Sequence, residues 1–312
     1  MRNLSVLINQ ARRATENVEF SDTEGLQNSE FIQYANDAQD EIEAQTSRVN
    51  ADVFMASSVI QCVAGQEDYS VPSDALLGTK IAQVLWAPSG NATSYMRLQQ
   101  GRMSEITATY AGTPSYFVRI GRTIKLIPAP QSSTSTIKVY YQQKLPRLEL
   151  QSGKVGTVSL TSNGITSLVL DDTFANDVAA LTEEGYITIV DSDGTIKMKD
   201  IPVSDIDENT LIVTVAPGFT FDAGETIAVG DFVLRGTRST THSQLPDICE
   251  RFLLSYMQWR ILKRDSSNDS AEQEGEMKMH LQSIIDAFSE PDLTVDGIPI
   301  INTEYLDLGD RM

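Results

Sequence analysis

The sequence predicts an α+β protein: a helical bundle packed with a small antiparallel sheet, an inserted all-β barrel or sandwich, and an extended C-terminal tail. Apolar residues recur with the helical period near the N-terminus and again before residue 290. Between them, residues 53 to 240 carry short apolar runs separated by turn residues. With 312 residues, 41% hydrophobic and 21% charged, the composition is that of an ordinary folded chain large enough for more than one domain.

Two helices are expected at the N-terminus. The first follows from Leu4, Leu7, Ile8 and Ala11, which fall on one helical face. The second begins at Asn28 or Ser29, residues that suit a helix cap, and runs to Val49. Its apolar stripe consists of Phe31, Ala35, Ala38 and Ile42. A narrow, alanine-rich stripe of this kind predicts close packing against another helix.

Residues 53–145 are expected to form the small antiparallel sheet. Its clearest part is a hairpin, in which Ser115–Ile120 and Thr123–Ile127 flank the turn Gly121-Arg122. Pro128 and Pro130 should end the second strand, because proline cannot donate to a β-ladder. Further strands are predicted over Ile81–Trp86 and Ile137–Gln142.

Residues 150–240 differ from their surroundings and are predicted to be an inserted β domain. Residues 151–240 carry 14 acidic and 5 basic side chains, a net charge of -9. About six strands are expected, over Val155–Leu160, Ser167–Leu170, Tyr186–Val190, Thr195–Met198, Leu211–Val215 and Thr226–Leu234. Short, evenly spaced strands with glycine-containing turns are typical of a barrel or sandwich.

Helices return after the insertion. Pro246 and Asp247 suit a first helical turn, and Ile248, Phe252, Tyr256 and Trp259 supply an apolar face. A second helix over Ser270–Phe288 completes a helical hairpin. We therefore expect residues 1–149 and 241–289 to form one core, 150–240 the insertion, and 290–312 an extended docking tail. The tail is rich in apolar side chains, at Leu293, Val295, Ile298, Ile300, Ile301, Tyr305 and Leu306.

Composition excludes several classes of function. The net charge of -19 disfavours sequence-specific nucleic-acid binding, which depends on lysine and arginine contacts to phosphate. No apolar run approaches the length of a membrane helix, and Leu4–Ile8 is too short for a signal-peptide core. The two cysteines, Cys62 and Cys249, lack a metal-binding spacing and are expected to be buried thiols in a protein made in a reducing cytoplasm.

Candidate chemistry is sparse, and we expect neither an enzyme nor a cofactor. Nucleotide-binding and nucleophile-elbow motifs are absent from the sequence, and neither His242 nor His280 belongs to a metal-binding motif. The pair Asp171-Asp172 and the run Asp191–Gly194 leave three interpretations open: turn chemistry, a calcium site, or an acid/base pair of a hydrolase. The basic pairs Arg12-Arg13 and Lys263-Arg264 suit either helix ends or a salt-bridging patch for a partner protein.

Three phrases in the chain carry a resemblance to a known family. They are Y-x-V-P-x-D-x-L-L at residues 69–77, I-x-L-I-P-x-P at 124–130, and V-Y-Y at 139–141. Together with the order of elements around them, these phrases resemble the head-to-tail adaptor proteins of short-tailed bacteriophages, including the related tubular tail protein beneath the portal. The resemblance covers residues 1–148 and 240–312. Tyr69, Pro72, Asp74, Pro128 and Pro130 would then be structural signature residues. We expect Tyr69 to pack on the sheet, Pro72 to fix the corner where the chain enters the sheet, and Asp74 to accept backbone N–H bonds in that turn.

The resemblance implies a structural virion protein at the head–tail junction, assembled in the host cytoplasm. Such adaptors form a ring, here expected to be dodecameric, that joins the capsid portal to the tail nozzle or hub and continues the DNA channel. The apolar residues of the tail, Leu293 to Leu306, would dock on the portal. Residues 150–240 lie outside the resemblance and would be an insertion that serves as a spacer or as a docking platform for tail fibres. The alternative is that the chain is a host-surface or carbohydrate-binding module of a phage tail.

Overall fold

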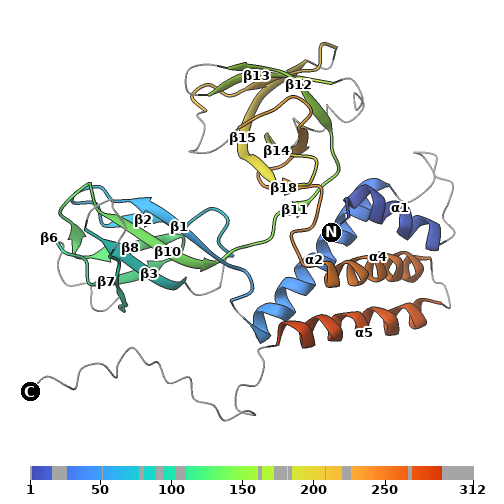
Figure 1. Cartoon of the computed structure of the whole chain (residues 1–312), viewed down its shortest axis with the longest axis horizontal. Coiled ribbons are helices and arrows are strands. Elements are labelled where there is room, and N and C mark those ends of the chain that lie inside the picture. Colours follow the sequence, from blue (N-terminus) through green and yellow to red (C-terminus); the bar gives the residue numbers. More distant parts are fainter. Residues whose placement is uncertain are drawn as a thin grey trace, which may run out of the picture.

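In the computed structural model, helices occupy one end of the molecule, two sheets occupy the other, and a barrel lies to one side of both (Figure 1). The structure describes residues 2–15, 27–50, 52–76, 81–88, 94–102, 110–160, 164–171, 181, 185–207, 209–219, 226–265 and 269–289. The mixed α+β class and the presence of a barrel are confirmed.

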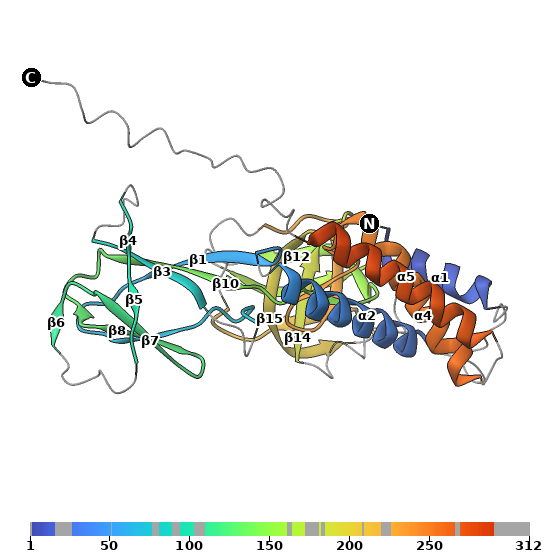
Figure 2. The same ribbon diagram turned by 90° about the horizontal axis from the view of Figure 1, so that it is seen from below.

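The helical end contains four α-helices: α1 (Leu4–Ala14), α2 (Asn28–Val49), α4 (Glu250–Arg264) and α5 (Ser270–Phe288). A 3-10 turn, η3 (Asp247–Cys249), leads into α4. Helix α4 contacts α1, α2 and α5, and in Figure 2 it lies among them. The side chain of Asn3 caps α1 by accepting a hydrogen bond from the Ser5 amide at 2.9 Å.

The helix boundaries agree with the sequence, but two buried faces differ from the expectation. The expected stripe of α2 is buried, yet Ile32, Tyr34 and several polar residues are buried beside it, so the face is wide rather than narrow. Ile248 does not belong to the apolar face of α4, because it lies on the preceding 3-10 turn and is 45% exposed.

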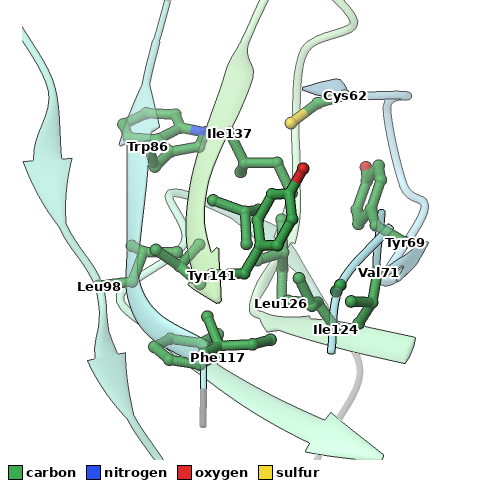
Figure 3. Close-up of a cluster of buried hydrophobic side chains, with 14 residues drawn as sticks. Cys62, Tyr69, Val71, Trp86, Leu98, Phe117, Ile124, Leu126, Ile137 and Tyr141 are labelled. Carbon is green, nitrogen blue, oxygen red and sulfur yellow. The ribbon is translucent and has the colours of Figure 1, made fainter. Parts of the chain in front are cut away.

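The other end of the molecule contains two four-stranded sheets that share one core. The first has the order β1 (Met55–Gln61), β10 (Thr136–Gln142), β3 (Ile81–Ala87) and β4 (Met96–Arg97). The second has the order β2 (Asp68–Ser70), β8 (Thr123–Ile127), β7 (Tyr116–Ile120) and β5 (Gln99–Gln100). Side chains from both sheets, including Trp86, Phe117 and Ile137, pack into a single buried cluster (Figure 3).

The expectation of one small antiparallel sheet is therefore only partly correct. The hairpin β7–β8 is as predicted, with Gly121 at a positive φ of 60° in its turn. However, β5 pairs with β7 in parallel, and β6 (Ala111–Gly112) pairs in parallel with β9 (Ala129–Pro130). Strand β8 ends at Ile127, directly before Pro128, as expected, whereas Pro130 is the last residue of the further short strand β9. Two-residue strands of this kind leave no period in the sequence, which is why they were not predicted.

Residues 153–235 contain a closed six-stranded barrel with the order β12, β13, β16, β15, β14, β17. Its strands are β12 (Gly153–Leu160), β13 (Ile165–Leu170), β14 (Tyr186–Val190), β15 (Ile196–Asp207), β16 (Ile212–Val215) and β17 (Phe232–Arg235). Strand β15 is longer than expected and β17 is shorter. The barrel has an apolar core of its own, which includes Leu168, Ile189 and Val213.

Candidate functional site

The stretch that carries the first family-like phrase forms a corner at the edge of the sheet core. Tyr69 is buried in that core (Figure 3), and its hydroxyl hydrogen bonds to the backbone of Val63, accepting from the amide at 3.1 Å. The Ala75 amide donates to the Pro72 carbonyl at 3.0 Å, which closes a tight turn. Tyr69 is therefore a core residue, and Pro72 belongs to the turn at this corner.

Asp74 lies at the centre of a cluster of polar contacts that the sequence did not reveal. Its carboxylate accepts hydrogen bonds from the Tyr141 hydroxyl and the Gln143 amide, each at 2.8 Å, and lies 3.4 Å from the Arg238 guanidinium. Burial alone would raise the pKa of the Asp74 carboxyl, but these two hydrogen bonds and the charge of Arg238 outweigh it and lower the pKa. Asp74 is thus a stable anion rather than an acid poised for proton transfer.

Helix α2 holds the segment that connects the sheets to the barrel. Four polar residues of α2, spaced three or four apart, bond to the chain between Gln142 and Leu148, and we call them the α2 ladder: Asn36, Gln39, Glu43 and Ser47. Asn36 bonds both the amide and the carbonyl of Leu148 at 2.9 Å, and Gln39 donates to the Pro146 carbonyl at 2.7 Å. Because both partners are backbone groups, the ladder fixes the path of the connecting segment.

The chain returns from the barrel beside the outgoing segment. Strand β11 (Arg147–Leu148) pairs in parallel with β18 (Ser239–Thr240), so the two connections run side by side. Arg238 links them, because it donates to the Lys144 carbonyl at 2.9 Å and also faces Asp74. A cavity of about 270 Å³ lies between α2 and these connections. We call Asp74, Tyr141, Gln143 and Arg238, together with the α2 ladder, the junction.

Glu43 is the buried carboxyl of the junction. It is 4% exposed and accepts one hydrogen bond, from the Leu145 amide at 3.2 Å. Burial raises its pKa, and the hydrogen bond from Leu145 opposes the rise without cancelling it. A carboxylate at this position costs stability when it is ionised, so the junction contains one anion that is well satisfied and one that is poorly satisfied.

The turn Asp191–Gly194 has a structural explanation. The Asp191 carboxylate accepts from the amides of Asp193 and Thr195, at 3.0 and 2.8 Å, as in an Asx turn. The Thr240 hydroxyl donates to the Gly194 carbonyl at 2.6 Å, and a side chain at Gly194 would meet the His242 ring. The turn therefore docks against the returning connection, and turn chemistry is the interpretation that the contacts support.

Other candidate residues do not gather into a site. Asp172 lies outside the described residues, and within them no cluster of metal-ligating side chains is present. His280 lies 3.5 Å from Glu276 on the same helix face. In the basic pairs, Arg12 donates to Asn28 at 2.7 Å, Arg264 lies 3.1 Å from Glu30, and Lys263 lies over the Trp259 ring. These three side chains make contacts within the chain.

The two remaining signature residues lie apart from the junction, and the expected docking residues of the tail lie outside the described part of the chain. Pro128 and Pro130 are buried at the far end of β8, where the Pro130 carbonyl accepts from the Gly65 amide at 2.8 Å. The proposed docking residues of the tail, Leu293, Val295, Ile298, Ile300, Ile301, Tyr305 and Leu306, lie outside the described residues.

The α2 ladder is the functional feature that sequence reasoning missed. Its signal is present in the chain, since polar residues recur at positions 36, 39, 43 and 47 in phase with the helix. No role was expected of these residues from the sequence, because polar residues on a helix are usually exposed. A polar stripe beside an apolar stripe on one helix can instead bind backbone groups of an extended segment.

The comparisons with known proteins agree with the fold and the phrases. The model of the SU10 adaptor protein family matches residues 2–179, a stretch that includes α1, α2, both sheets and the first two barrel strands. The resemblance read from the sequence was placed on residues 1–148 and 240–312, whereas the match continues past residue 148 to residue 179 and does not include 240–312. A search of curated proteins finds no match. None of the described helices is long and apolar enough to cross a membrane. The family match confirms the expected resemblance to phage head–tail adaptors, and because it spans more than half of the chain, the chain belongs to the SU10 adaptor protein family and has a structural role as a phage adaptor.

Proposed function

We propose that this adaptor forms a closed ring, expected to be dodecameric, that joins the capsid portal to the tail nozzle or hub. The observation that carries this proposal is the family match across the helices, the sheets and the start of the barrel. A ring follows from repeated head-to-tail contact between identical chains when the rotation closes. The ring would continue the DNA channel at the head–tail junction of the virion.

The arrangement of the chain suits a joint between two different neighbours. Helices and sheets lie at opposite ends, so that each end can face a different protein (Figure 2). Residues 1–149 and 241–289 would act as one adaptor core, with the helices as a bundle packed with the sheets. The junction would keep the two ends at a fixed angle, because its hydrogen bonds are directional.

The charge of the protein fits a channel through which DNA passes. The net charge of -19 gives little affinity for phosphate, so DNA would move past the ring without being held. No sequence-specific contact with DNA is part of the proposal.

Residues 290–312 would bind the portal through their apolar side chains. The test is to mix portal rings with the full-length protein and with a variant carrying Ile300→Asn and Ile301→Asn, and to image the mixtures by electron microscopy. The substitutions leave the charge unchanged and remove two apolar anchors, so we expect rings of the variant to form but to bind portal at least tenfold more weakly. An Asn302→Ser variant is the control. Undiminished portal binding by the double variant would remove the tail from the portal interface.

The barrel would act as a spacer or as a docking site for tail fibres. Carbohydrate binding is the alternative, and it is favoured by one observation: Tyr186, an aromatic side chain of β14, is 42% exposed on the barrel. A glycan array probed with the full-length protein and with Tyr186→Ala separates the two. Binding that is lost with Tyr186 would favour the carbohydrate-binding module, and a blank array would leave the barrel as a spacer or docking site.

A further inference from the structure

Strand β1 is the longest open sheet edge at the sheet end of the molecule. Among the described residues it pairs with β10 alone, along all seven residues from Met55 to Gln61. The other outer strands of these two sheets, β2, β4 and β5, have only two or three residues each. An edge of seven residues can accept a further strand, and natural proteins normally protect such edges.

The register shows which groups of β1 point to the open side. The Gln143 amide bonds the Phe54 carbonyl, and the Cys62 amide bonds the Ser135 carbonyl, so even-numbered residues of β1 face β10. The backbone groups of Ser57, Val59 and Gln61 therefore point away from β10. Their N–H and C=O groups form a row of hydrogen-bond donors and acceptors that a further strand could pair with.

The usual protection of an edge strand is absent from β1. Its sequence, MASSVIQ, contains no charged residue and no proline. Val59 is 57% exposed, and Val63, just past the strand, is 50% exposed. Lys138, the partner of Val59 on β10, places a positive charge near the edge, with its ammonium over the Tyr140 ring.

The end of the described chain lies beside the start of this edge. Phe288, in the last turn of α5, and Phe54, next to β1, pack against the same buried cluster. The 23 residues from Glu290 to Met312 follow, with nine large apolar side chains and with 6 acidic residues against 1 basic residue. Residues 289–292 can span roughly 13 Å when extended, so a strand that begins at Leu293 can start beside Met55, the residue after Phe54, and reach Gln61 at Pro299. An acidic, apolar segment also complements an edge with Val59 and Lys138.

We propose that residues 293–299 of the same chain add to β1 as a parallel outer strand in the isolated protein. The direction follows from the geometry, because a segment leaving Phe288 near Phe54 must run along β1 from Met55 toward Gln61. Intramolecular addition is favoured by the short tether, which gives a high effective concentration. Pro299 is compatible with an outermost strand, where its missing N–H faces solvent.

This inference goes beyond the proposed adaptor function and does not depend on it. The tail would cover the edge before assembly, and the portal would compete with β1 for the tail. With the tail on β1, an unassembled chain would not expose this long strand edge to other copies of the protein. The experiment below contains no portal protein. A negative result would therefore overturn this inference without bearing on whether the tail binds the portal.

The test is hydrogen exchange on the full-length protein and on a variant ending at Ser289. We expect the amides of Ser57, Val59 and Gln61 to exchange at least tenfold more slowly in the full-length protein, and those of Ser58 and Ile60, which face β10, to be equally protected in both. Equal exchange of the outward amides in the two proteins would overturn the proposal. Protection that grows with protein concentration would overturn the intramolecular assignment, since the tail of another copy would then cover the edge.

Two full-length variants test whether the tail lies along β1 itself. Val59→Glu places a negative charge in the middle of β1, where it repels the acidic tail, and should reduce protection of the Ser57 and Gln61 amides to the level of the truncated protein. Val63→Glu adds the same charge at a similarly exposed site outside the strand and should leave protection unchanged. Protected Ser58 and Ile60 amides would show that the variants are folded. Retained protection in Val59→Glu would count against a strand at this edge.

Discussion

The barrel and the junction are held together by different physical means. The barrel core is built from apolar side chains such as Leu168, Ile189 and Val213, all fully buried. The junction contains Asp74, Arg238 and the α2 ladder, which act through hydrogen bonds and charge. Apolar packing supplies most of the stability but has little direction, whereas hydrogen bonds to backbone groups set orientation. The alternation of apolar residues along its strands therefore specifies the barrel, whereas the hydrogen bonds of the junction set its orientation relative to the rest of the chain.

This difference gives each region its own expected response to mutation. Damage to the barrel core should lower stability strongly and locally. Damage to the junction should lower stability less, and should loosen the angle between the barrel and the rest of the chain.

The largest effect is expected from Leu168→Ala in the barrel. Leu168 is fully buried, and replacing it leaves a cavity, so we expect a loss of about 3 kcal/mol in the free energy of unfolding. Urea denaturation measures the loss, and hydrogen exchange should place it in β12 to β17. Val229→Ala, at a side chain that is 75% exposed, is the control and should change stability by less than about 0.5 kcal/mol. A loss spread evenly over the sheets would show that barrel and sheets unfold as one unit.

A smaller effect is expected from Asp74→Ala in the junction. The change leaves Tyr141, Gln143 and Arg238 without their shared acceptor, and we expect a loss of about 2 kcal/mol. Small-angle scattering should also show a broader range of distances between barrel and sheets. Ser73→Ala, at an exposed neighbour, is the control. An unchanged scattering profile would show that the α2 ladder alone fixes the barrel.

The contribution of Asp74 should depend on pH in a defined direction. Its carboxyl has a lowered pKa in the folded state, so its stabilising effect is present above the unfolded value of about 3.9 and is lost as the pH falls through the lower, folded value. The stability difference between the native protein and Asp74→Ala should therefore be constant from pH 7 to about 4 and should shrink below that.

Helices and strands could be predicted from the sequence wherever a segment has a single clear apolar period or turn signal. The helices α2 and α5 and the hairpin β7–β8 were predicted nearly to the residue, and the presence of α1 was predicted from its apolar face, because apolar periods and a turn glycine are local signals. The barrel strands were found, with errors at β15 and β17. Asp200, at a positive φ of 55° in the middle of β15, is the kind of turn-like residue at which a strand is expected to end.

The junction could not be predicted, because its contacts join distant parts of the chain. Asp74 meets Gln143 and Arg238, and Gln39 meets Pro146 and Ser243, across more than 60 residues in each case. Local reasoning placed Asp74 at a corner and gave its carboxylate the amides of the turn as partners. The structure instead gives its carboxylate the side chains of Tyr141, Gln143 and Arg238.

The smallest effect, and one of opposite sign, is expected from Glu43→Gln. Burial raises the pKa of Glu43, so the folded state binds the proton more tightly, and ionised Glu43 costs stability increasingly as the pH rises above the unfolded value of about 4.3. Glutamine cannot ionise and can still accept from the Leu145 amide. The variant should be more stable than the native protein at pH 7, by roughly 1 kcal/mol, and nearly equal to it at pH 4.

Urea denaturation at the two pH values measures this difference, and Asp40→Asn is the matched control. Asp40 is one turn away on α2 and exposed, and it forms a surface ion pair with Arg147 at 3.2 Å, so its replacement should change stability by less than about 0.5 kcal/mol. If Glu43→Gln is instead less stable at pH 7, the charge on Glu43 strengthens its bond to Leu145 by more than burial costs. Glu43 would then belong with Asp74, as an anion that the junction is built to hold.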